Sequence, residues 1–299
     1  MELTINLSYI IATHNRLPFL RITLEKLVNE LLPDEEIVVV DGNSTDGSKA
    51  YLQKLFDEGK IHRFISEPDK NQAHAWNKAM LMAKGIILKK VIDDDVFYYH
   101  AIRKCKDFML ANPLVDVIIS NDLGANLYDY KNIQKTTRRP QFEKWKNGID
   151  PSFTFGDVHM LIRRASLAYI GLYNTSFIMM DWEYSLRISY LQACIVYYTG
   201  YNALSVAHAQ SVSSLKNTAM ITEQGKKGAG FYEYKGDRHE ISLWSKIKIQ
   251  AGKWLKSKKE SGVIVKDEPA EEMGFIYNYL YDHIAEVNNA QEFTFLEQA

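Results

Sequence analysis

Residues 86–95 read IILKKVIDDD, an apolar strand that runs directly into three consecutive carboxylates. Asp93, Asp94 and Asp95 repel one another in a poorly solvated cleft, by about 1 kcal/mol per pair in water and several times more near protein. A divalent cation such as Mg²⁺ or Mn²⁺ removes this repulsion, because hard ions bind carboxylate oxygens and bridge them to phosphates. The alternative is an acidic turn after a strand, and the triplet alone does not decide between the two.

Strands and helices alternate at regular intervals before this stretch. Strands are predicted at residues 7–12, 37–40 and 61–65, and helices at 20–31, near 51–56 and at 73–83. Pro18 suits the first turn of the first helix, and Gly85 suits the C′ position of the last one. The alternation predicts an α/β domain with a largely parallel sheet.

Polar clusters follow three of the predicted strands, at residues 13–16, 41–46 and 93–95. Ligands of open α/β sheets bind beyond the carboxyl ends of the strands, so we expect these clusters to converge on one cleft. The glycine patterns G-x-G-x-x-G and G-x-x-x-x-G-K-[ST] are both missing, which counts against dinucleotide oxidoreductases and P-loop enzymes. A phosphate-bearing ligand would then be held through a metal ion.

Composition is that of an ordinary globular protein, with 299 residues, 46% hydrophobic residues and a formal net charge of −1. No global field attracts nucleic acid, and nucleic acid is not an expected partner. Cys105 and Cys194 are too few for a disulfide framework, which favours reduced thiols and a cytoplasmic location. The start of the chain does not read as a secretory signal. The uncharged stretch 188–215 contains many polar residues and predicts a helix end followed by buried strands.

The second half of the chain has a weaker pattern. Residues 115–120 predict a strand, whereas 121–150 show little periodicity and predict a long loop, either covering a ligand or solvated. Another apolar strand is predicted after His159. Asp181 precedes a helical pattern, where a carboxylate either caps the helix or acts as a general base.

A C-terminal extension begins near residue 216. Its basic and aromatic part, 226–259, predicts a helix that either packs on the catalytic domain or lies peripherally on the inner face of an anionic membrane. The acidic part, 268–299, has Phe275, Ile276, Tyr279 and Leu280 at helical spacing. It predicts a docking helix or a partner surface.

Four segments together resemble the family 2 glycosyltransferases of the GT-A fold: ATHNR, VVVDGNSTDGS, SEPDKNQAHAWNKAMLMAKG and the strand that ends in DDD. The resemblance covers about residues 5–100. It implies a Rossmann-like, mostly parallel sheet flanked by helices in a domain at 1–215, with a nucleotide-sugar half at 1–120 and an acceptor half at 121–215. Residues 216–299 would be a helical extension.

The resemblance also implies an activity. The enzyme would be a metal-dependent, inverting hexosyltransferase that moves a sugar from a nucleotide-diphospho-sugar, with UDP as the default nucleotide, to an acceptor hydroxyl. The acceptor would be a glycan or a lipid-linked molecule in polysaccharide or cell-surface glycan synthesis. The donor sugar, the acceptor and the oligomeric state stay open.

Residue roles follow from the same resemblance. The donor-binding residues that it implies are Thr13, Asn15, Arg16, Asp41, Asp69, Asn77 and Asp93. Asp41 would accept a hydrogen bond from the base, although turn chemistry also explains it, and Asp46 is equally a helix cap.

The metal ion, Mn²⁺ or Mg²⁺, would be held by the D-x-D motif. Asp94 and Asp95 occupy the commonest pair of the family, while Ile92 replaces a further acid, and His208 matches a histidine near the metal. Asp181 would be the catalytic base, with Met180 replacing a preceding acid.

Two other functions compete with transfer. A nucleotidyltransferase of sugar phosphates would share the sheet and the metal carboxylates, but it needs a loop rich in glycine and lysine that ATHNR does not provide. A non-catalytic protein that binds sugar nucleotides would keep the donor end and have no use for Asp181.

Overall fold

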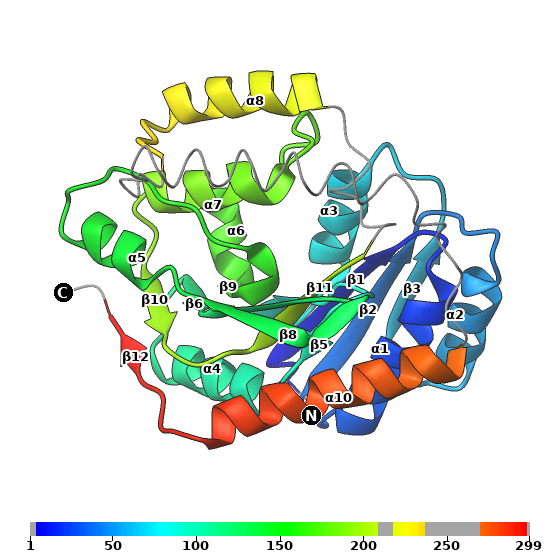
Figure 1. Cartoon of the computed structure of the whole chain (residues 1–299). Coiled ribbons are helices and arrows are strands. Elements are labelled where there is room, and N and C mark those ends of the chain that lie inside the picture. The colour runs from blue at the N-terminus through cyan, green and yellow to red at the C-terminus, as the bar shows by residue number, and fades with distance from the viewer. Residues whose placement is uncertain (1–3, 209–217, 237–269, 298–299) are drawn as a thin grey trace, which may run out of the picture.

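A central sheet of eight strands runs through the computed structural model of the chain, which describes residues 4–208, 218–236 and 270–297 (Figure 1). The strands lie in the order β12-β10-β6-β9-β4-β1-β2-β3. Their bounds are β1 Leu7–Thr13, β2 Glu35–Asp41, β3 Arg63–Ser66, β4 Ile87–Lys90, β6 Val117–Ser120, β9 Met160–Arg163, β10 Ile195–Tyr198 and β12 Phe295–Leu296. Only β9 and β12 run antiparallel to their neighbours among these strands. The predicted mostly parallel α/β sheet is therefore confirmed.

Helices cover both faces of this sheet (Figure 1). They are α1 Leu17–Glu30, α2 Ser48–Asp57, α3 Gln72–Met82, α4 Tyr99–Ala111, α5 Arg139–Lys146, α6 Leu167–Ile170 and α7 Met180–Tyr190, with short 3₁₀ turns at Asp157–His159 (η1) and Arg164–Ser166 (η2). Side chains alternate along β1, so that Tyr9 packs towards α1 and α4 while Ile10 packs towards α3. Both faces of β1 and β2 are buried, which explains why the middle of each strand, Tyr9–Ala12 and Ile37–Val40, is a continuous apolar run.

A second, four-stranded sheet has the order β5-β11-β7-β8. Its strands are β5 Val96–Phe97, β7 Asp122–Asn126, β8 Asp129–Thr136 and β11 Ala203–Ala207. The prediction of a long loop at 121–150 is wrong, because this segment forms the β7–β8 hairpin and then α5. Most of β8 is exposed, so its sequence carries no alternation of apolar and polar residues. Pairing with β7 defines the strand instead.

Gly85 has a different role from the predicted one. Helix α3 ends at Met82, and Ala83 after it is extended, so no left-handed C′ residue follows. A Cβ on Gly85 would lie 2.6 Å from the backbone nitrogen of Ser8 in β1. The glycine therefore allows the chain that enters β4 to pass close to β1.

The C-terminal part contributes α8 Thr218–Phe231, α10 Ala270–Asn289 and β12. Helix α10 packs against α1, β5 and β11, with Tyr277, Leu280 and Ile284 fully buried. Phe275 is 64% exposed, so the predicted helical stripe is correct for Ile276 and wrong for this residue. Most of the basic segment, 237–259, lies outside the described residues. No helix among the described ranges combines the length and the apolar character needed to cross a membrane.

Candidate active site

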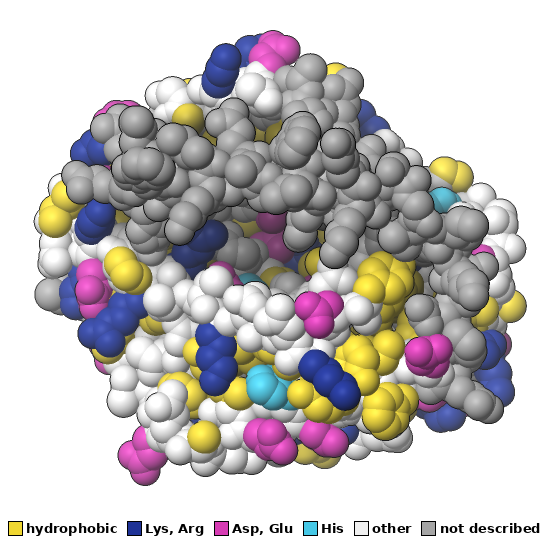
Figure 2. Space-filling view, in the orientation of Figure 1, with side chains coloured by type: hydrophobic (Ala, Val, Ile, Leu, Met, Phe, Trp, Pro, Cys, Tyr) yellow, Lys and Arg dark blue, Asp and Glu magenta, His cyan; other side chains and the backbone are white. Residues whose placement is uncertain are grey.

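A cavity of about 850 Å³ lies beyond the carboxyl ends of β1 and β4. Figure 2 shows a hollow near the centre of this face of the molecule, with basic and acidic side chains visible inside it. Its volume is in the range of small-molecule binding sites. Residues from both halves of the chain line it, from the turn at 13–16 to Asp181 and 205–207. The convergence predicted for the strand ends at 13 and 93–95 is therefore present.

Asp94 lies at the centre of a charged cluster in this cavity. Its Oδ2 accepts hydrogen bonds from Arg16 Nη1 at 2.8 Å and from His208 Nε2 at 2.7 Å. Burial opposes ionisation of Asp94, but the His208 hydrogen bond and the Arg16 charge outweigh it and lower the pKa of this carboxyl. Three segments far apart in the sequence thus meet at one carboxylate oxygen.

The flanking carboxylates are held by other parts of the fold. Asp93 accepts a hydrogen bond from Thr13 Oγ1 at 2.6 Å, and Asp95 accepts one from the Val206 amide at 2.8 Å. Burial and the neighbouring Asp94 charge raise the pKa of Asp93 to about 7 and that of Asp95 well above its ordinary value. With all three carboxylates ionised, the cluster would therefore carry more negative charge than its surroundings balance.

This cluster suits a hard divalent ion. Asp94 offers a carboxylate oxygen, which suits Mn²⁺ and Mg²⁺ alike, and His208 offers an imidazole nitrogen at the same point, which suits a transition metal such as Mn²⁺ better than Mg²⁺. The guanidinium of Arg16 at the same oxygen shows that a cation is favoured there. Within the described ranges, no three His, Cys, Asp or Glu side chains already stand in the arrangement of a metal site.

Asp41 does not line the cavity, although the adjacent Gly42 does. The Asp41 side chain is fully buried and accepts hydrogen bonds from the Ser44 amide at 3.0 Å and from Ser66 Oγ at 2.7 Å. The hydroxyl of Ser44 contacts its other oxygen. In this structure Asp41 therefore shapes the turn that forms one edge of the cavity.

Asn15 connects two of the predicted polar clusters. Its φ is 53°, a left-handed conformation that asparagine tolerates better than most residues. The backbone amide of Asn15 donates to Ser44 Oγ, and its side-chain Oδ1 accepts from the Thr45 backbone amide, both at 2.8 Å. Asp46 accepts from the first-turn amides of Leu17 and Ser48, the capping role that its position indicates.

Asp69 lines the cavity, whereas Asn77 does not. Asp69 Oδ1 lies 2.8 Å from Lys78 Nζ, so α3 holds this carboxylate in place. Asn77 exchanges two hydrogen bonds with the backbone of Tyr173, at 2.8 and 2.9 Å. It anchors the segment before α7 to α3.

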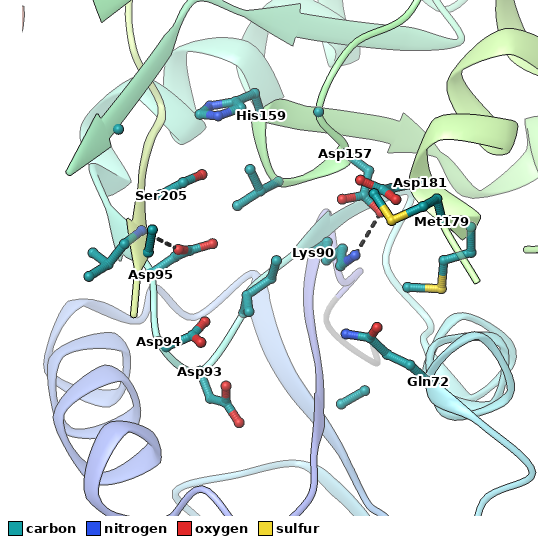
Figure 3. Close-up of a pocket in the computed structure, with 18 of the residues that line it drawn as sticks. Gln72, Lys90, Asp93, Asp94, Asp95, Asp157, His159, Met179, Asp181 and Ser205 are labelled. Atoms are coloured by element: carbon teal, nitrogen blue, oxygen red, sulfur yellow. Dashed lines mark hydrogen bonds and ion pairs between the residues drawn. The ribbon is translucent and has the colours of Figure 1, made fainter. Parts of the chain in front are cut away.

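Asp181 lies in the first turn of α7 and lines the opposite wall of the cavity (Figure 3). Burial, followed by the charge of Asp157, raises the pKa of Asp181, and Lys90 counteracts them. Its neighbour Trp182 packs on α8, where a Cβ on Gly228 would lie 2.8 Å from the indole ring.

Further lining residues were not identified from the sequence. They include Lys90, Asp122, Arg138, Asp157 and His159. The position of Lys90 in a buried strand indicated that its charge needs a partner, because an unpaired buried charge is costly. Nothing in the sequence indicated that the partner is Asp157.

The sequence profile described as glycosyl transferase family 2 matches residues 8–171. Chondroitin synthase from Pasteurella multocida is 26% identical over 115 residues, which are 38% of this chain and 12% of that protein. The putative teichuronic acid biosynthesis glycosyltransferase TuaG from Bacillus subtilis is 30% identical over 105 residues, 34% of this chain and 41% of that protein. The chain thus spans less than half the length of both relatives.

Solved structures share the fold. TarS residues 1–349 from S. aureus, in complex with UDP-GlcNAc, superimposes with a TM-score of 0.59 at 16% identity, covering 94% of this chain and 81% of that one. The mannosyltransferase PcManGT from Pyrobaculum calidifontis, in complex with GDP-Man and Mn²⁺, has a TM-score of 0.52 at 14% identity, covering 96% and 88%. The expected GT-A fold is therefore confirmed.

Proposed function

The chain belongs to glycosyl transferase family 2, and on that premise we propose that it moves a sugar from a nucleotide-diphospho-sugar to an acceptor hydroxyl with inversion. One observation carries the proposal: a single cavity has the Asp93–Asp95 carboxylates at one end and Asp181 on the facing wall. The first group suits a diphosphate with its cation. The second suits an attacking hydroxyl.

The donor occupies the part of the cavity formed by the 1–120 half of the chain. Thr13, Asp69 and Asp93 line it, while Asn15 and Asp41 hold the two turns that border it. We take uridine as the nucleotide. Guanosine is the alternative, since solved structures of this fold include complexes with either UDP-GlcNAc or GDP-Man.

Asp94, Asp95 and His208 would hold Mn²⁺ or Mg²⁺. When bound, such an ion neutralises the charge that develops on the departing diphosphate. Arg16, which already lies 2.8 Å from Asp94, adds a fixed positive charge at the same end of the cavity. Charges aimed in advance at the place where charge develops contribute strongly to catalysis.

Asp181 acts as the general base. The acceptor oxygen forms a bond to the anomeric carbon as the bond to the diphosphate oxygen breaks, and the hydroxyl proton passes to the carboxylate. Its raised pKa suits this role, because a base works best when its pKa approaches the working pH. General base catalysis of this kind contributes about 10²–10⁴ in rate.

The acceptor enters along the wall formed by the 121–215 half, including β7, β8 and η1. We propose a glycan or a lipid-linked acceptor in the synthesis of a polysaccharide or cell-surface glycan. A lipid-linked acceptor would agree with peripheral membrane contact through 226–259. Binding to anionic liposomes tests that contact, which is wrong if removal of 226–259 leaves the bound fraction unchanged.

A screen of UDP- and GDP-sugars tests the proposed function. Thermal shift with and without Mn²⁺ measures binding, and nucleotide release measures donor hydrolysis or transfer. Asp94→Ala should abolish metal-dependent donor binding, whereas Asp181→Asn should keep binding and lose turnover. The reverse pattern would overturn the roles. Donor binding without turnover in the native chain would indicate a binding protein instead of an enzyme.

A further inference from the structure

Lys90 and Asp157 form a buried ion pair in the wall of the cavity. Lys90 Nζ lies 2.6 Å from Asp157 Oδ2, and the two side chains are only 4% and 5% exposed. Tyr173 donates its hydroxyl to the same oxygen at 2.7 Å. The ammonium also lies 4.4 Å from the centre of the Trp76 ring, a cation–π distance. The pair is thus fixed from several sides.

Each member comes from a rigid part of the fold. Lys90 ends β4 in the middle of the central sheet, and Asp157 begins the η1 turn that leads into β9. Tyr173 is held through its backbone by Asn77 of α3. The pair therefore has little freedom to move relative to the start of α7, where Asp181 lies.

Asp181 stands beside this pair in the cavity (Figure 3). The groups that face it are Asp157 from η1, Lys90 from β4 and the hydroxyl of Tyr173 from the segment before α7. Asp157 disfavours the ionised form of Asp181, and Lys90 favours it. On α7 itself, Glu183 is paired with Arg187 at 2.9 Å.

This arrangement suggests a role beyond structural support. A buried ion pair can be replaced by apolar side chains with little loss of stability, so its presence needs another explanation. A carboxylate buried next to a second carboxylate would take up a proton and lose its use as a base. Lys90, which is fixed between β4 and η1, opposes this protonation of Asp181. The charge of Asp157 keeps the proton affinity of Asp181 high.

Resting on the assignment of Asp181 as the base, we propose that Lys90 and Asp157 are positioning residues that set the protonation of Asp181 in opposite directions. Lys90 keeps the carboxylate ionised at the working pH. Asp157 holds Lys90 in place and increases the proton affinity of the base. Neither residue touches the reacting atoms.

The test is the pH dependence of kcat/KM for nucleotide release, with the UDP- or GDP-sugar that the native enzyme turns over fastest. Lys90→Met should move the acidic limb of the profile to higher pH, by about 1 unit, because a fixed charge nearby is removed. Asp157→Asn should move it to lower pH. The double variant should lie between the two. Shifts of the same sign, or activity losses without any shift, would overturn the proposal.

Matched variants separate this test from misfolding and from failure of the proposed function. Lys90→Arg keeps the charge and should keep the limb near its native position. Tyr173→Phe keeps every charge and removes one hydrogen-bond donor from Asp157, so it should move the acidic limb slightly to higher pH. If Lys90→Met does not fold, an unchanged limb in Tyr173→Phe would contradict the proposal. If Asp181→Asn retains turnover, the base assignment fails. If that variant is inactive while the limbs stay unshifted, only the positioning role fails.

Discussion

Two groups of carboxylates face the cavity, and different kinds of cation balance them. The strand-end cluster, Asp93–Asp95, meets Arg16 and His208, which come from segments at the edge of the cavity. The helix-start cluster, Asp157 and Asp181, meets Lys90, which is fixed within the central sheet. The first cluster lies where a ligand's cation can replace a side chain. The second is built so that its cation stays in place.

The two clusters consequently suit different tasks. Three neighbouring carboxylates at the strand-end cluster would suit the cation and the diphosphate of the proposed donor. At the helix-start cluster, Lys90 offsets part of the negative charge, and the raised pKa of Asp181 suits a carboxylate that takes up a proton during a reaction. The following changes test this difference, from the largest expected effect to the smallest.

Lys90→Met should cost the most stability. It leaves Asp157 buried without its cation, and breaking a buried pair from one side costs about 3–5 kcal/mol. Denaturant unfolding measures the loss. Lys90→Met combined with Asp157→Asn should recover most of it, since no uncompensated charge is left. A double variant as unstable as the single one would show that packing, and not charge, explains the loss.

Gly228→Ala should disturb the helix-start cluster through Trp182. The added methyl group would lie 2.8 Å from the indole ring, and overpacking of this kind costs about 1–3 kcal/mol. We expect several-fold lower turnover with unchanged nucleotide affinity, because Trp182 adjoins Asp181. Gly230→Ala on the same helix is the control, since no atom lies within 4 Å of the new Cβ. Equal effects of the two changes would contradict the packing explanation.

Arg16→Met should destabilise the metal-free protein by about 1.5 kcal/mol, the lower range for a hydrogen bond to a charged group. Added Mn²⁺ should then raise the melting temperature more in this variant than in the native protein, because the ion replaces the lost cation at Asp94. Lys90→Met offers the contrast, and Mn²⁺ should not rescue it. A smaller Mn²⁺ effect in Arg16→Met would show that Arg16 assists metal binding.

Lys89, next to Lys90 in β4, is a buried lysine whose hydrogen-bond partners are neutral oxygens instead of a carboxylate. It is fully buried, donates to the Val158 carbonyl and to Asn202 Oδ1 at 3.1 Å, and burial lowers its pKa to about 7. Between this value and the ordinary pKa near 10.5, the unfolded chain binds more protons than the folded one. The free energy of unfolding should therefore rise with pH in this window, by at most about 1.4 kcal/mol per unit. Lys89→Met should lack this rise, and an identical slope in both proteins would exclude Lys89 as its cause.

The sequence predicts the strand-end cluster and Asp181, but not the pair of Lys90 and Asp157, for a physical reason. Asp93–Asp95 are neighbours in the chain at the end of a buried strand, so local sequence reveals them. Lys90 and Asp157 are 67 residues apart and meet only because β9 inserts antiparallel between β4 and β6. No local pattern encodes that insertion.

The same reason explains which elements were predicted. From β1 to β4, each strand is buried on both faces or followed by an amphipathic helix. The first gives a continuous apolar run and the second a helical periodicity, and both are clear in the sequence. Strand β8 is exposed on most positions and owes its conformation to a partner strand, so 121–150 looked irregular. The role of Asp181 stays a prediction that the proposed experiments test, and the role of Asp41 in binding the base stays a prediction.

Helix α10 has a practical consequence for anyone who shortens the chain. The Tyr277 hydroxyl donates to the Asp94 carbonyl at 2.6 Å, across 183 residues of sequence, and Leu280 and Ile284 of the same helix cover Val96 and Leu204. An expression fragment that ends near residue 215 would uncover this apolar surface. Such a fragment would be expected to aggregate, and its Asp93–Asp95 turn would have lost a support that begins only at residue 270.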